Sequence, residues 1–193
     1  MRATTRLTTG GLAALTAALA LAACGTTNRT TTEAPPATAT AKAPPAATTT
    51  AAPPCRTAAL SWTLARLGTA KGVGHARLTA RNDGPGTCVF GGYPGLEIHN
   101  GKADSIDGAG HGHPAAVTLP VRAAIAVDLR YTPAGTPGAG SWCVLQTEAV
   151  VRAPHDSRPA VVPVTDAHLR AATIDACGAT VPMAPPRRVA QGR

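Results

Sequence analysis

The feature that most constrains this fold is the spacing of apolar residues from Cys55 onward. Hydrophobic side chains recur at alternate positions over short stretches, and Gly, Pro, Asn and Asp interrupt them repeatedly. Residues 75–81 (HARLTAR) alternate with period two, which is typical of a strand with one buried face. Residues 82–86 (NDGPG) are a dense turn signal. No window carries a helical apolar stripe, apart from a possible short turn within residues 165–172.

Many short strands at spacings of about eight to twelve residues favour a β-sandwich. We therefore expect an all-β domain over residues 55–183, with an Ig-like antiparallel β-sandwich fold. The expected strands are residues 58–66, 75–81, 87–90, 96–99, 115–119, 124–131, 144–152, 160–164 and 180–183.

The first 23 residues have the pattern of an export signal. Arg2 and Arg6 precede an almost wholly apolar run, residues 11–23. Thirteen helical residues rise about 20 Å, which is short of the roughly 30 Å hydrocarbon core of a bilayer. The run is therefore interpreted as the apolar region of a signal peptide.

Residues 21–24 (Leu-Ala-Ala-Cys) resemble a bacterial lipobox. This resemblance implies cleavage before Cys24, diacylglycerol on its sulfur and acylation, for example by palmitate, of the new amino terminus. Two alternatives stay open: ordinary signal peptidase cleavage that leaves Cys24 free, or a structural role for Cys24. Lipidation predicts an extracytoplasmic protein, anchored by Cys24 to the outer face of the cell membrane, since several acyl chains give stable attachment.

Residues 24–54 are expected to form a stalk. After Cys24, ten of thirty residues are Thr, nine are Ala and six are Pro, and none is a large hydrophobe. Such a segment has too little apolar surface to offset its ordering entropy, so we expect it to be disordered. Its composition is also typical of O-glycosylated stalks.

Four cysteines follow the stalk: Cys55, Cys88, Cys143 and Cys177. An exported protein meets an oxidising environment, so disulfides are expected in preference to metal ligation. Four cysteines allow three connectivities, and the sequence alone does not choose among them. The sequential pairing, Cys55–Cys88 and Cys143–Cys177, is the one we favour.

The net charge of +8 does not indicate nucleic-acid binding. Residues 55–182 carry eleven Lys and Arg against nine Asp and Glu, so most of the excess lies towards the chain ends. A phosphate-binding face would cluster basic residues on one element. Only five aromatic residues occur, too few for a stacking surface. Residues 184–193 are expected to be a disordered basic tail, with contact to an anionic membrane as the alternative for Arg187 and Arg188.

Catalytic motifs are not recognisable in the domain. Ser61, Ser105, Ser141 and Ser157 lie outside any G-x-S-x-G elbow, and the cysteines are expected to be paired. We therefore predict no catalytic residues, no cofactor and no metal. One constellation argues otherwise: His111 and His113, close to Asp104 and Asp107, have donor types that suit zinc or copper. A solvated loop is the favoured interpretation of these residues.

The segment Thr87-Cys88-Val89-Phe90-Gly91-Gly92-Tyr93-Pro94-Gly95-Leu96 is the most distinctive in the chain. Together with Cys55, the Gly74-His75 strand start and the Asn82-Asp83-Gly84 turn, it resembles a family of exported actinobacterial proteins. That family is catalogued as domain of unknown function 4232. Members are commonly lipoproteins with a stalk and carry two later cysteines, here Cys143 and Cys177. The resemblance implies a fold and an anchor but no activity.

This sequence departs from the family pattern in one place. A Pro-Gly turn usually follows the V-T-L strand, whereas Pro120, Val121 and Arg122 follow it here. Within the distinctive segment, Tyr93 is interpreted as a structural corner, with a ligand-facing role as the alternative. Trp62 and Trp142 are expected to pack in the core near the disulfides.

These observations predict a non-enzymatic, membrane-anchored module that presents loops to an unknown envelope protein or glycan. A protease or hydrolase inhibitor is the alternative, with residues 132–141 as the inhibitory loop. A metal-binding envelope protein, using His111 and His113, is a further one.

Overall fold

The computed structural model describes residues 51–99 and 105–190. The expected signal peptide, Cys24 and most of the expected stalk lie outside these residues. The described part contains thirteen strands, one short 3-10 turn at Thr57–Ala59, and no helix long and apolar enough to span a membrane. The strands are β1 (Leu60–Ala70), β2 (Val73–Asn82), β3 (Cys88–Phe90), β4 (Gly95–His99), β5 (Ser105–Gly110), β6 (Val117–Leu119), β7 (Ala124–Pro133), β8 (Cys143–Gln146), β9 (Glu148–Arg152), β10 (Ala160–Asp166), β11 (Ile174–Cys177), β12 (Thr180–Met183) and β13 (Arg187–Arg188).

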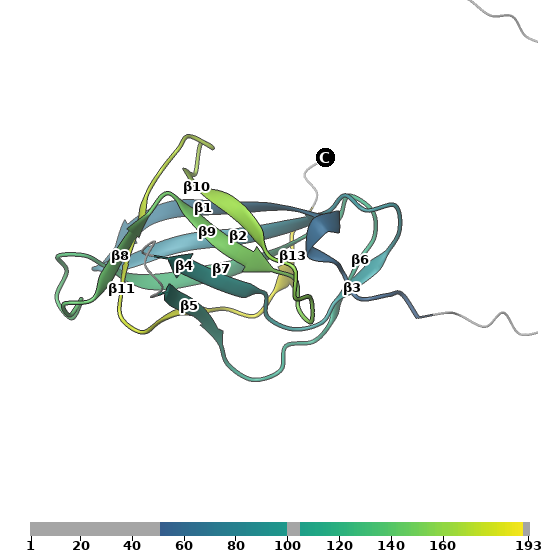
Figure 1. Ribbon diagram of the computed structural model, residues 1–193, viewed down its shortest axis with the longest axis horizontal. Helices are drawn as coiled ribbons and strands as arrows, with labels where there is room; N and C mark the ends of the chain where they lie inside the picture. Colours follow the sequence, from purple (N-terminus) through teal and green to yellow (C-terminus); the bar gives the residue numbers. More distant parts are fainter. Residues whose placement is uncertain (1–50, 100–104, 191–193) are drawn as a thin grey trace, which may run out of the picture. The chain divides into compact units, whose positions relative to one another are not determined.

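Eight strands close into a barrel in the order β12-β5-β4-β9-β10-β1-β2-β7 (Figure 1). The ring closes where β7 meets β12, with Met183 opposite Leu129. Next to this pair, the Ala184 N–H donates to the Asp128 carbonyl at 2.8 Å. Two of the pairings between adjacent strands in the ring are parallel: β1 with β10, and β5 with β12.

The prediction of an Ig-like antiparallel β-sandwich is therefore wrong. A sandwich keeps two separate sheets, whereas β12 here pairs with β5 on one side and with β7 on the other. The sheet bends round onto itself as a result. Alternating apolar residues are expected in both architectures, so this pattern could not distinguish them.

The all-β prediction itself is confirmed, and all but one of the expected strands match a single observed strand. Residues 144–152 instead divide into β8 and β9, which are separated by Thr147. The short strands β5, β11 and β13 were not predicted. Within residues 165–172, the first two end β10, and the others form a turn and not a helix.

The core is aliphatic and follows the alternation seen in the sequence. In β2, Ala76, Leu78 and Ala80 are buried while the residues between them are partly exposed. Phe90 is the one fully buried phenylalanine, and the half-buried Trp62 packs against it with ring centroids 6.3 Å apart. The chain therefore fills its core with Leu, Ile, Val and Ala, which explains how so few aromatics suffice.

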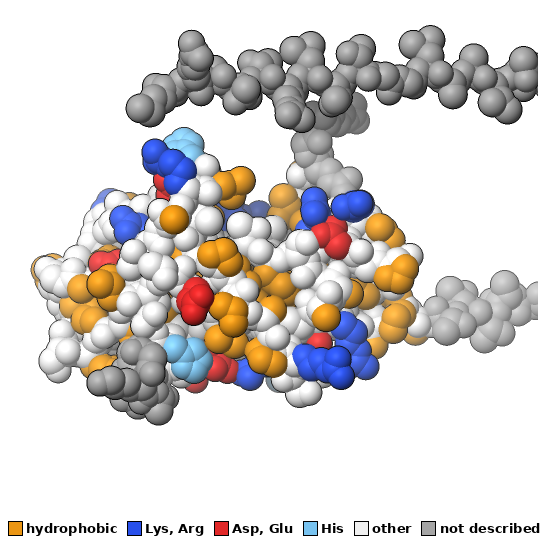
Figure 2. Space-filling model, turned by 45° about the horizontal axis from the view of Figure 1, so that its top comes forward, with side chains coloured by type: hydrophobic (Ala, Val, Ile, Leu, Met, Phe, Trp, Pro, Cys, Tyr) orange, Lys and Arg blue, Asp and Glu red, His pale blue; other side chains and the backbone are white. Residues whose placement is uncertain are grey.

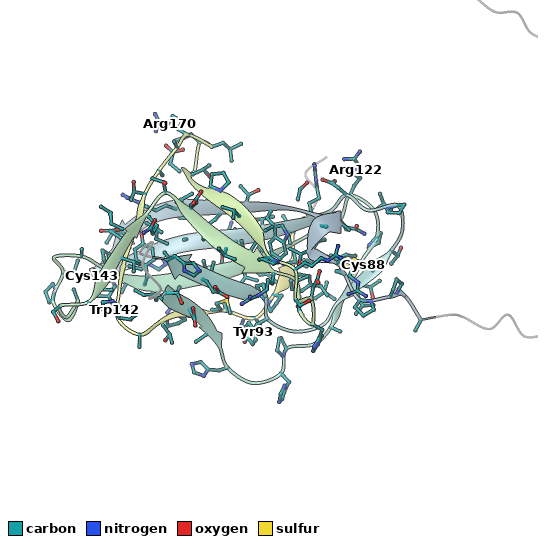
Figure 3. All side chains as sticks on the ribbon, viewed as in Figure 1. Cys88, Tyr93, Arg122, Trp142, Cys143 and Arg170 are labelled. Carbon is teal, nitrogen blue, oxygen red and sulfur yellow. A yellow bond between two sulfur atoms is a disulfide. The ribbon has the colours of Figure 1, made fainter. Side chains whose placement is uncertain are left out.

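Two disulfides lie at opposite ends of the barrel, and they join the cysteines sequentially. Cys55 pairs with Cys88 beside the small β3–β6 sheet, and Cys143 pairs with Cys177 across β8 and β11. We call these the Cys55 end and the Trp142 end (Figure 3). The chain enters the barrel at the Cys55 end, where Val89 N–H donates to the Pro53 carbonyl at 2.8 Å.

Residues 184–190 differ from the disordered tail that was expected. β13 pairs with β7 through Arg187 and Arg188, and Val189 N–H donates to the Ala124 carbonyl at 3.0 Å. Arg187 also forms a 2.9 Å ion pair with Asp128. The basic residues of this segment are thus used by strand pairing and ion pairing, which composition alone did not indicate.

Candidate interaction surface

Two serines and two histidines of the described residues contact nearby groups that do not form a triad with them. Ser61 donates its hydroxyl hydrogen to Asp83, and Ser105 donates to Asp107 at 2.8 Å. The imidazole of His99 lies 3.0 Å from Glu97, and that of His155 lies 3.1 Å from the Gly91 carbonyl. Each of these polar side chains therefore has a local partner and does not face a shared reacting atom.

The two histidines considered for metal binding lie exposed in the loop after β5. Tyr93 O–H donates to the His111 carbonyl at 2.9 Å, which holds this loop against the start of β4. Within residues 51–99 and 105–190, no three His, Cys, Asp or Glu side chains are grouped closely enough for a metal ion. Asp104, the other carboxylate considered, lies outside the described residues.

Tyr93 is a packing residue in this structure. Its ring covers Gly110 so closely that a methyl group there would overlap the ring. Its hydroxyl is used by the His111 carbonyl. The structural-corner interpretation of Tyr93 therefore agrees with its contacts.

The segment considered for protease inhibition, residues 132–141, begins with the last two residues of β7 and continues as two turns and an irregular stretch. Thr136 N–H donates to Pro133 and Ala139 N–H donates to Thr136. Gly135, Gly138 and Gly140 all have positive φ. Peptides recognised by strand addition are extended, and this loop does not present such a segment.

Exposed hydrophobic side chains gather at the Trp142 end. Trp142 is 39% exposed and does not pack in the core as predicted, and Leu145 on β8 is 69% exposed. Figure 3 shows Trp142 and Cys143 at the end of the barrel opposite Cys88. We define the Trp142-end surface as Leu67, Val73, Trp142, Leu145 and Leu169, which are five of the eight large exposed hydrophobics of the described residues.

Leu169 is held at the tip of a tight hairpin between β10 and β11. Asp166 accepts hydrogen bonds from the N–H groups of His168 at 2.8 Å and Arg170 at 3.0 Å. These backbone donors, that of Arg170 foremost, together with the Arg170 side chain lower the pKa of Asp166 to about 2. Leu169 itself has φ +62° and is 71% exposed. A bulky residue in this backbone region is strained. Because the Leu169 side chain is mostly exposed, its burial does not offset that strain.

β8 leaves one side of its backbone without a strand. In the sheet order it stands last, and it pairs with β11 alone among the described strands. Leu145 projects from this short edge. An exposed edge strand is a site at which another chain can add a strand. The Trp142-end surface thus combines apolar anchors with a strand edge on which no second described strand pairs.

A family model matches residues 55–185 of this chain, and its description is a domain of unknown function. The chain belongs to the DUF4232 family. No curated protein and no solved structure matches the chain. The matched region begins at Cys55 and contains both disulfides, whereas β13 follows its end.

In this DUF4232 domain a turn still follows β6, although Pro120, Val121 and Arg122 replace the usual Pro-Gly. Ala123 N–H donates to the Pro120 carbonyl at 3.0 Å, so residues 120–123 form a turn. Arg122 adopts φ +69° there, a backbone region that glycine occupies without strain. Its backbone N–H donates to the Asn82 carbonyl at 2.7 Å, which ties this turn to the NDG turn.

The buried Asn82 is the residue at the Cys55 end whose role sequence reasoning missed. Its amide nitrogen donates to Gly86 at 2.8 Å and to Leu119 at 2.9 Å, and its oxygen accepts from the Gly84 N–H. The Asn-Asp-Gly motif was available as a signal, but it indicated only a turn. The hydrogen bond from Asn82 to Leu119 on β6 could be identified only from the fold.

Proposed function

We propose that this protein is a membrane-anchored cell-envelope lipoprotein whose DUF4232 domain is a non-enzymatic binding module. The lipobox ending at Cys24, the Thr/Ala/Pro-rich stalk and the two disulfides support export and anchoring. A binding role is favoured by the apolar side chains that the described residues expose.

We further propose that the Trp142-end surface recognises a protein partner. The observation that carries this proposal is the exposure of Trp142 and of Leu145 on β8 at the end opposite Cys88, together with that of Leu169 on the hairpin between β10 and β11. Aromatic and large aliphatic side chains are common anchors of protein interfaces. Leu169 gains support from the strained hairpin that displays it. Recognition of a protein, rather than a glycan, suits the apolar character of these anchors.

The anchoring half of the proposal is tested by fractionation of cells that express the full chain. Wild-type protein is expected in the membrane pellet, and Cys24→Ser is expected in the soluble fraction or the medium. Retention of the Cys24→Ser protein in the pellet would contradict lipid anchoring. Mass spectrometry of the wild-type protein then identifies the acyl groups.

The binding half is tested by photo-crosslinking in intact cells. A photoreactive amino acid replaces Leu145, and the crosslinked partner is identified and then purified. Leu169→Ser and Trp142→Ala are each expected to lower affinity for that partner at least about fivefold, since truncating a central anchor often costs more than about 1 kcal/mol. Val161→Ser is the matched control, because Val161 is 62% exposed but lies on β10. Equal losses in all three variants, or binding to purified envelope polysaccharide alone, would contradict the proposal.

A further inference from the structure

The charge of the described residues is concentrated at the Cys55 end. Five arginines lie there against two aspartates, whereas the rest of the described residues carry seven basic and six acidic groups. Figure 2 shows blue side chains at the right-hand end of the molecule, where β3 and β6 lie in Figure 1, and a further group at its upper left. The charged residues of this end are Arg56, Arg81, Arg122, Arg158, Arg188, Asp83 and Asp156.

Arg56 and Arg158 border a surface cavity of about 570 Å³, which Ser157 and Asp156 also line. Both arginines are exposed, and Arg56 interacts electrostatically with Asp156, whose pKa it helps to lower. The carboxylate of Asp156 accepts backbone hydrogen bonds, from the Thr57 N–H at 2.7 Å and from the Arg158 N–H at 3.2 Å. Two exposed arginines and one carboxylate therefore line the cavity, which leaves it with a net positive charge.

A second cavity at the same end is lined by apolar side chains and one arginine. It measures about 530 Å³ and is lined by Pro120, Val121, Val189 and Arg188, among others. Val121 is 44% exposed and Val189 is 37% exposed. Valines beside arginines suit the boundary between lipid headgroups and acyl chains, because apolar side chains enter it while guanidinium groups stay at phosphate level.

We propose that the Cys55 end of the DUF4232 domain docks on an anionic membrane surface. Arg56 and Arg158 bind lipid phosphate groups, while Val121 and Val189 enter the headgroup layer. Two observations select this occupant. The excess of arginine complements anionic lipid, and the chain that leads back to Cys24 enters the barrel at this end.

The orientation rests on the proposed lipid anchor, which would hold the domain near the bilayer at a high effective concentration. Even a weak contact is then occupied for much of the time. The Trp142-end surface would point away from the membrane, towards a partner in the envelope. The docking surface and the partner surface therefore occupy opposite ends of the same barrel.

The test uses the mature chain from residue 24 with Cys24→Ser, so that no acyl chain contributes to binding. Sedimentation with vesicles measures its partition coefficient at about 0.1 M salt. Vesicles of phosphatidylglycerol and phosphatidylcholine in equal parts are expected to bind the protein, and pure phosphatidylcholine vesicles are not. Arg56→Gln/Arg158→Gln is expected to lower the partition coefficient about 25-fold, at about fivefold for each arginine.

The matched control is Lys71→Gln/Arg130→Gln, which removes the same charge from the exposed surface away from the Cys55 end. This variant is expected to stay within about twofold of the parent protein. Equal losses in the two double variants would overturn the proposal, because they would reflect net charge alone. Absence of binding to anionic vesicles would overturn it as well, as would equal binding to neutral ones. Direct binding of free inorganic phosphate by a protein that does not bind vesicles would identify an anion site instead and would also overturn it.

These outcomes are independent of the anchor, because the tested chain carries no lipid. A protein that binds anionic vesicles but is not lipidated in cells would contradict the proposed anchoring and leave the docking surface supported. A lipidated protein whose unlipidated form ignores vesicles would support the anchor and overturn the docking surface.

Discussion

Two glycines allow tyrosine rings to lie across neighbouring strands of the barrel. Tyr131 on β7 covers Gly74 on β2, its direct partner in the sheet, and Tyr93 covers Gly110 on β5. An added methyl group at either glycine would overlap the ring. Glycine is therefore required at these positions for close packing and not for its backbone freedom.

We predict that Gly74→Ala lowers the free energy of unfolding by about 1–3 kcal/mol, because overpacking forces the Tyr131 ring or the strand to move. Urea denaturation of the purified domain-containing chain measures this change. Gly86→Ala is the control, since its new methyl group meets open space, and it is expected to change stability by less than about 1 kcal/mol. Similar stabilities for Gly74→Ala and the parent would show that the ring packing is easily rearranged.

The most consequential short elements are β12 and β13, which follow one another along β7. β12 closes the barrel, and β13 extends the chain over Ile125 and Ala126. The family match ends at residue 185, so it includes β12 but not β13. We infer that β13 adds stability to a barrel that is already closed.

Ending the chain after Pro185 is expected to lower the free energy of unfolding by about 1–3 kcal/mol, through the lost backbone hydrogen bonds to β7. Arg187→Gln in the full chain is expected to cost less than about 1 kcal/mol, since its ion pair with Asp128 is half exposed. Denaturation curves of both proteins test this order. An equal loss from the two changes would mean that the ion pair, and not the strand, carries the stabilisation.

At the scale of the whole molecule, four aspartates stabilise the fold through hydrogen bonds to their charged forms. The pKa of Asp83 is lowered by Ser61 and Arg81, and that of Asp156 by the backbone N–H groups of Thr57 and Arg158. Burial raises the pKa of Asp128, but Arg77 and Arg187 more than offset it. The fourth is Asp166 in the Leu169 hairpin, with a pKa of about 2.

These shifts predict acid sensitivity. Each folded pKa lies below the usual value of 3.8, so the unfolded state binds protons first as the pH falls. The stabilisation is present above about pH 4 and is lost as the pH falls towards about 2. The melting temperature, followed by circular dichroism, is expected to be level from about pH 7 to about pH 5 and then to decline. Asp166→Asn is expected to flatten the decline, and a melting temperature independent of pH would contradict the prediction.

Much of the local structure could be predicted from the sequence because the evidence for it is local. Alternation in residues 75–81 and the NDGPG turn concern neighbours in the chain, and both features are present in the structure. β5 escaped prediction because Gly and Ala fill three of its six positions, so it shows little hydrophobic alternation. β13 escaped because two arginines carry no strand signal, and only pairing with β7 makes them a strand.

By itself, the sequence determined an all-β domain, its family and where its turns lie, since each depends on residues close together in the chain. Tertiary structure alone decided the closed barrel, since β12 must reach both β5 and β7 from a distant part of the chain. It also decided that arginines gather at the Cys55 end and exposed hydrophobics at the Trp142 end. Such surfaces combine side chains from separate strands, and strand pairing across the barrel, rather than order in the sequence, brings those strands together.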